Sequence, residues 1–252
     1  RFLDNLPPDL SAGHAMPGAA YPALVRFSNA AGTGADDNKR DLRGVAIRYT
    51  VSENEQHDLL ATNFPVSHAR DARQFVAFAV ATAGGRISKV IGLLRLLVTL
   101  GPIETIRMLR NVSAGRRRTP ASVALETYWS RGAICWGETL AVRYLLRPGP
   151  NAQSAPVPTG HDPDYLAHEA AKRLAEGPIT MELCIQRYLN ETATPIEDTA
   201  IEWQARATPP GEDHHHDKET EQKRHPSAIQ QLHQVGGEEH AIDEDERQDQ
   251  RG

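Results

Sequence analysis

The sequence predicts an α+β fold in which an antiparallel sheet or barrel is interrupted by a helical insertion. Period-two alternation of apolar and polar residues, typical of half-buried strands, recurs early and late in the body of the chain. Helical spacing is confined to its middle and to one later segment. Strands, then helices, then strands again favour helices packed beside one antiparallel sheet.

Five segments carry the strand pattern. Within the longer ones, aliphatic side chains and Tyr share one face and polar side chains the other, because successive side chains of a strand point to opposite faces. The predicted strands cover residues 24–28, 44–49, 140–146 and 179–186, with 201–203 as a shorter candidate.

Apolar residues at helical spacing predict four helices. Phe75, Phe78 and Ala79 form a stripe on the first. Pro102 suits the first turn of the third, where its missing N–H is not needed. The predicted helices cover residues 71–82, 86–100, 103–111 and 165–176, and residues 148–158 are predicted to form a loop.

Composition divides the chain into a body, 1–204, and a polar acidic tail, 205–252. The tail has no Phe, Tyr or Trp and carries 12 Asp and Glu against 6 Lys and Arg, so the net charge of −5 of the whole chain belongs to it. Such a segment cannot bury a core, and we expect it to be disordered. The near-neutral body argues against nucleic acid as a partner.

Other features narrow the class of protein. The most apolar run, 90–100, has 11 residues and is too short to cross a bilayer. The two cysteines, Cys135 and Cys184, are too few for a disulfide framework, so both cytoplasm and periplasm stay open as locations. We interpret both as small buried residues. Residue 1 is Arg, and we expect the chain to begin inside a longer gene product.

Three strings of residues occur in order along the body. They are YPALVRFSNAAG at 21–32, RDLRGVAIRY at 40–49 and DLLATNFPVSHARD at 58–71, followed by Phe75. Together they resemble the core of the haem catalases and, more closely, the shorter catalase-like haem peroxidases. Residues 128–130 with 141–144, and 195–198 with 202–203, are similar to later landmarks of that branch.

This resemblance implies a β-barrel core with haem b that reacts with hydrogen peroxide or organic peroxides. Arg26 would pair with a haem propionate, because a planar guanidinium matches a carboxylate; otherwise it is an exposed strand Arg. Ser28 would support a distal His, and its alternative is a hydroxyl bonded to the backbone at a strand edge.

Three further residues match family positions. Gly44 would let the backbone approach the porphyrin, or it permits a bulge. Asp41 would lie in the substrate channel, or it forms a surface ion pair between Arg40 and Arg43. Phe75 would stack on haem, which is hard to separate from core packing.

The family's distal Asn falls on Thr62 or Asn63. These neighbours face opposite sides of an extended segment, so the choice matters. We select Asn63 because its amide both donates and accepts hydrogen bonds. The alternative is an Asn that caps a turn before Pro65.

The resemblance also implies residues that we do not find. His14 lies too close to the strand of Arg26 to be the distal His, and no Tyr has the Arg four positions earlier that marks the family's iron ligand. We predict no metal site: the cluster at 214–217 is interpreted as solvated. An upstream segment would place a His over a cavity lined by Arg26, Gly44 and Phe75.

Three functional interpretations follow. The first is a catalase-related haem protein that acts on peroxides but is inactive as it stands, because the distal and proximal residues are missing. The second is a non-catalytic relative that binds haem or lipid peroxide weakly or not at all. The third is a folded product without activity. No membrane partner is expected, and a homo-oligomer is compatible with all three.

Overall fold

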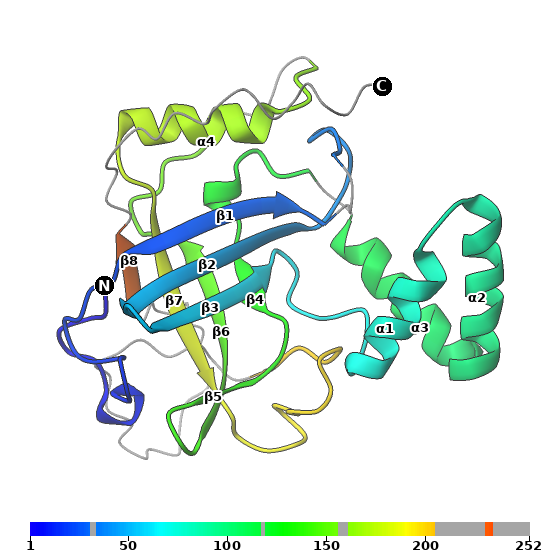
Figure 1. Ribbon diagram of the computed structural model, residues 1–252, viewed down its shortest axis with the longest axis horizontal. Helices are drawn as coiled ribbons and strands as arrows, with labels where there is room; N and C mark the ends of the chain where they lie inside the picture. Colours follow the sequence, from blue (N-terminus) through cyan, green and yellow to red (C-terminus); the bar gives the residue numbers. More distant parts are fainter. Residues whose placement is uncertain (31–33, 117–118, 156–160, 205–229, 234–252) are drawn as a thin grey trace, which may run out of the picture.

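The computed structural model describes residues 1–30, 34–116, 119–155, 161–204 and 230–233. Its described part consists of one antiparallel sheet and α-helices on the sheet's flanks (Figure 1), so the α+β prediction is confirmed. The strands are β1 Ala23–Asn29, β2 Arg43–Ser52, β3 Glu55–Thr62, β4 Tyr128–Ser130, β5 Ile134–Trp136, β6 Leu140–Pro148, β7 Thr180–Arg187 and β8 Gln230–His233.

The sheet is open, so the prediction of a closed barrel is wrong. Its strand order is β1-β2-β3-β4-β6-β7-β8, with β5 paired to β6, and in the described residues β1 and β8 are edges. The sheet curls so that β1–β3 cross the direction of β6 and β7 (Figure 1). The core lies between the two halves, where Val45 and Ile47 of β2 join Leu146 and Ile185. Alternation of apolar and polar residues shows that one face of a strand is buried. A curled open sheet buries one face of its strands just as a barrel does, so the pattern does not distinguish the two.

Where the strand predictions failed, the reasons are local. β3 was missed because Leu60, next to two inward residues, is 58% exposed and breaks the alternation. β4 and β5 have three residues each, too few to show a period. Residues 201–203 form no strand. Trp203 is buried, and its indole donates to the carbonyl of Pro195 at 2.9 Å, so its apolar character reflects burial in a loop.

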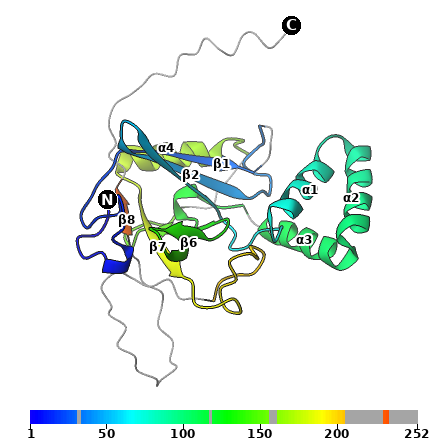
Figure 2. The ribbon, with the colours of Figure 1, turned by 60° about the horizontal axis from the view of Figure 1, so that its bottom comes forward.

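The helical insertion is confirmed. Helices α1 (Ala72–Thr82), α2 (Arg86–Leu100) and α3 (Pro102–Gly115) lie together beyond one end of β1–β3 (Figures 1 and 2). A Cβ at Gly92 would lie 2.1 Å from the carbonyl oxygen of Ala81, so glycine permits the close approach of α2 to α1. Helix α4 (Tyr165–Glu176) packs its first turn against Val123.

Of the predicted tail, the structure describes only Gln230–His233, which pair with β7 as strand β8. The other residues of 205–252 lie outside the described residues, so the boundary and the expected disorder stay predictions. Within the described part, no helix combines the length and apolar character needed to cross a membrane.

Candidate functional site

The outer face of β1–β3 brings together Arg26, Ser28 and Gly44, which the resemblance implies, and Thr62, the alternative to Asn63. Val25 packs towards the core, so Arg26 and Ser28, on alternate positions, face outward. Ser28 pairs in register with Gly44 of β2, and Gly44 pairs with Thr62 of β3. Ser28, Gly44 and Thr62 therefore form a row across the three strands, on the face that carries Arg26.

Because Gly44 has no side chain, no side-chain atoms cover the backbone of β2 at the centre of this row. A Cβ there would lie 3.1 Å from Ser28 Oγ, tighter than ordinary contact. The irregularity in β2 falls between Thr50 and Ser52, so Gly44 lies in regular register and the bulge interpretation of this glycine is wrong. Its position suits the alternative, a close approach to the sheet from outside.

Arg26 is exposed and, within the part of the chain that the structure describes, takes no part in an ion pair. Arg48 is different, because its guanidinium donates to Asp58 at 2.8 Å. Leu24 and Leu60 also face outward and are 74% and 58% exposed. The face therefore offers apolar surface and an uncommitted guanidinium, which suit a flat apolar molecule that carries a carboxylate.

Asn63 is buried and its amide is engaged inside the fold. Its Oδ1 accepts the backbone N–H of Arg43 at 2.8 Å, and its Nδ2 donates to Glu126 Oε2 at 2.9 Å. Thr62 lies on the other side and accepts from Arg131 Nη1 at 2.7 Å. The structure thus joins Asn63 to the start of β2, and its distal role stays a prediction.

Asp41 is only 6% exposed, so the interpretation as a surface ion pair is wrong. Its carboxylate accepts the backbone N–H of Leu42 at 2.9 Å and lies 3.5 Å from Nε of Arg116, which follows α3. The neighbouring Arg43 is buried and donates to backbone carbonyls of the loop before β2. Asp41 therefore links this loop to the helical insertion, and its channel role stays a prediction.

Phe75 is 52% exposed on α1, so it is not a core residue. Its ring centroid lies 5.3 Å from that of His68, which also approaches Phe78 at 4.6 Å. Sequence reasoning missed His68, because only these ring contacts distinguish it from a polar loop residue. Burial, reinforced by Arg131 and Arg107, lowers the pKa of His68 to about 4.

We predict that His68 makes the stability of the protein pH-dependent. The unfolded chain binds a proton at this residue near pH 6.5 and the native chain only near pH 4. Between these values the unfolded state holds more protons, so the free energy of unfolding falls as the pH is lowered. His68→Phe is expected to flatten this decline in denaturant titrations, whereas His161→Ala, at an exposed site, is expected to follow the wild type. Equal slopes in all three proteins would contradict the assignment.

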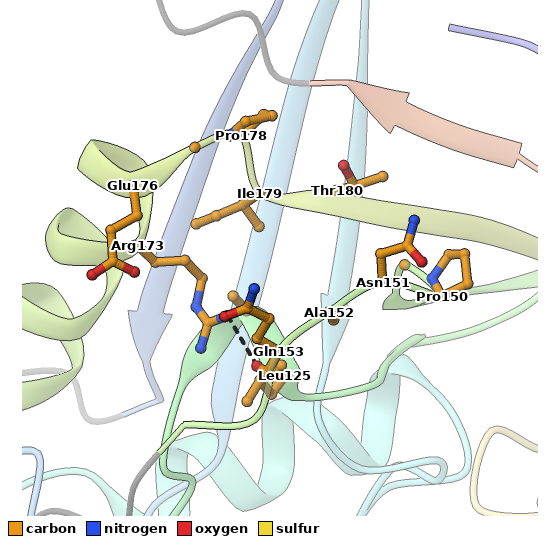
Figure 3. A pocket seen from close by; sticks show the side chains of 13 residues that line it. Leu125, Pro150, Asn151, Ala152, Gln153, Arg173, Glu176, Pro178, Ile179 and Thr180 are labelled. Atoms are coloured by element: carbon orange, nitrogen blue, oxygen red, sulfur yellow. Dashed lines mark hydrogen bonds between the residues drawn. The ribbon is translucent and has the colours of Figure 1, made fainter.

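The cavities found in the described residues lie away from the outer face of β1–β3. One of about 320 Å³ lies between α4 and the start of β7 (Figure 3), where Arg173 donates to the carbonyl of Gln153 at 3.0 Å and is paired with Glu169 at 2.7 Å. A second cavity lies beside α4, and two more lie near the N-terminus. The residues that line these four cavities do not include Arg26, Gly44 or Phe75. The expectation of one cavity shared by those three residues stays a prediction.

The outer face fits haem in part. Gly44 and the exposed leucines suit the porphyrin plane, and Arg26 suits a propionate. The hydroxyls of Tyr128, Tyr144 and Tyr165 donate to backbone carbonyls inside the fold, at 2.8, 2.9 and 2.6 Å. The hydroxyl of Tyr49 lies on the inner side of β2, 2.6 Å from His14 Nε2. These four tyrosines therefore do not present a free hydroxyl to the outer face, where haem would lie.

Comparison with known proteins points to one family. A model of the family Catalase matches residues 12–84. The chain is 29% identical over 184 residues to a catalase-related peroxidase of Mycolicibacterium paratuberculosis (strain ATCC BAA-968 / K-10), covering 70% of this chain and 58% of that protein. It is 42% identical over 60 residues to Catalase HPII of Mycobacterium avium, covering 23% and 8%.

A solved structure of a bacterial catalase shares the fold. It superposes with a TM-score of 0.55 at 20% sequence identity, covering 75% of this chain and 40% of that one. The chain thus spans 58% of the length of the catalase-related peroxidase that it matches. The matched family segment, 12–84, contains every candidate site residue predicted from the sequence.

Proposed function

Because this chain belongs to the catalase superfamily, we propose that it acts in peroxide-related chemistry and that the outer face of β1–β3 accepts haem b. The observation that carries the proposal is the uncommitted guanidinium of Arg26 beside the Ser28–Gly44–Thr62 row. Haem, when bound, supplies the redox chemistry of the peroxide reaction.

The chain's own residues have separate tasks in this proposal. Arg26 pairs with a propionate and sets the orientation of the porphyrin edge. Gly44 lets the porphyrin plane come close to the backbone of β2. Ser28 Oγ lies where a side chain at position 44 would point. Its hydroxyl is therefore placed to donate or accept a hydrogen bond at the bound group.

Arg26→Ala is expected to weaken haemin binding by about fivefold, because an exposed ion pair contributes up to ~1 kcal/mol. The measurement is a titration of the full chain with haemin, followed by the Soret band. Arg48→Ala is the matched control, since Arg48 lies on the same face of the sheet but is held by Asp58. A larger loss in the control than in Arg26→Ala would contradict the propionate assignment.

Gly44→Val tests the approach to the sheet in the same titration. The added side chain would cover the row and push against Ser28 Oγ, so the Soret shift should be lost while the far-ultraviolet circular dichroism is retained. The control is Gly34→Val, where a Cβ meets no atom within 4 Å. Unchanged haemin binding by Gly44→Val would place haem elsewhere.

A second candidate function is a non-catalytic relative that binds haem or lipid peroxide. The observation that favours it is the engagement of the tyrosine hydroxyls inside the fold, where Tyr128 and Tyr144 donate to backbone carbonyls at 2.8 and 2.9 Å and Tyr49 lies 2.6 Å from His14 Nε2. Haemin binding without peroxide-dependent oxidation of a reducing substrate and without oxygen release distinguishes this candidate from a catalase-related enzyme.

A further inference from the structure

The inner face of the β2–β3 hairpin carries a cluster that sequence reasoning missed. Glu55 and His57 are two residues apart on β3 and therefore share a face. Tyr49 of β2 pairs in register with His57, and their rings stack with centroids 5.3 Å apart. The alternation Glu-Gln-His on a strand is the signal that could have revealed the pair.

His14, from the loop before β1, completes the cluster. Its ring centroid lies 4.1 Å from that of His57, and its Nδ1 lies 3.9 Å from Glu55 Oε1. The same Glu55 oxygen lies 2.9 Å from His57 Nε2. One ligand atom from each of the three residues falls within 4.8 Å of the other two.

We propose that His14, Glu55 and His57 form a binding site for a divalent first-row transition metal ion, with Tyr49 as a positioning residue. Two imidazole nitrogens and one carboxylate oxygen are a donor set that Zn²⁺ and its neighbours accept. With bonds of about 2.0–2.1 Å, tetrahedral ligand atoms lie roughly 3.3 Å apart. The observed spacings need only small side-chain adjustments, which Glu55, half exposed, can make.

Tyr49 gives the site the outer support that metal-bound imidazoles normally have. Its hydroxyl lies 2.6 Å from His14 Nε2 and can accept a hydrogen bond from the N–H of that nitrogen. This hydrogen bond leaves His14 Nδ1, the atom nearer Glu55, free to bind an ion.

A cavity of about 300 Å³ adjoins the cluster and is lined by His14, Tyr49 and His57. With three protein ligands, a tetrahedral ion would keep one position for water or another small ligand. The site lies on the inner side of β2 and β3, opposite the face proposed for haem, so the two proposals are tested independently.

The test is calorimetric titration of the full chain with Zn²⁺. The background carries His214→Ala, His215→Ala and His216→Ala, which removes the other histidine cluster of the sequence. We expect one ion per chain. His57→Ala and Glu55→Gln should each weaken binding by more than the ~10- to 100-fold typical of losing an outer partner. His168→Ala, an exposed His paired with Asp162, is the matched control and should bind as the background does.

Tyr49→Phe separates positioning from simple structural support. It should weaken Zn²⁺ binding about 10-fold and change the visible absorption of bound Co²⁺, whose bands report coordination geometry. Thermal melts without metal verify that each variant folds. Absence of stoichiometric binding in the background protein, or equal affinities for background, His57→Ala and Glu55→Gln, would overturn the proposal.

Discussion

Asn63→Ala is expected to lower the free energy of unfolding by about 2–6 kcal/mol. The side chain satisfies two buried groups, the backbone N–H of Arg43 and Oε2 of Glu126. The loss of the hydrogen bond to each buried group costs about 1–3 kcal/mol. The loss should be measured by chemical denaturation of the haem-free chain, so that it reports folding alone.

The control for this prediction is Asn151→Ala, at an exposed turn beside the cavity of Figure 3, which should change stability by less than ~0.5 kcal/mol. If Asn63→Ala is as stable as the control, its bonds to Arg43 and Glu126 are dispensable and the structural role that these contacts indicate is contradicted. Loss of stability at unchanged haemin binding supports the role that these contacts indicate.

The second large effect concerns turnover. The haemin-loaded chain is expected to release oxygen from hydrogen peroxide at least ~10²- to 10⁴-fold more slowly than an enzyme with a positioned acid–base group. His14 and His57 lie on the inner side of the hairpin, and His68, with a pKa of about 4, is a weak base at pH 7. None of these three fits the family's distal base.

Oxygen release should be followed with an oxygen electrode, with free haemin as the baseline and Catalase HPII of Mycobacterium avium as the reference. We expect a rate near the baseline. Robust release that Arg26→Ala abolishes would show that the chain supplies a base and an iron ligand that we have not assigned.

The sequence alone determined the elements whose pattern is local. Helices α2 and α4 have the predicted bounds, and β1, β2, β6 and β7 agree within a few residues, because amphipathic periodicity arises when one face of a segment is buried. The order of short strings around Arg26, Gly44 and Phe75 likewise indicated the family, since it depends on residue identity and spacing.

Only the tertiary structure decided which segments meet. Whether the sheet closes depends on pairing between distant strands, and the alternation within β1 is the same in an open sheet and in a barrel. Of the neighbours Thr62 and Asn63, Asn63 is the one that faces the interior, where its amide bonds to Glu126, 63 residues further along the chain. His14 meets His57 only because the N-terminal loop folds over the hairpin. Periodicity describes one segment relative to its own axis, so it carries no information about such long-range contacts.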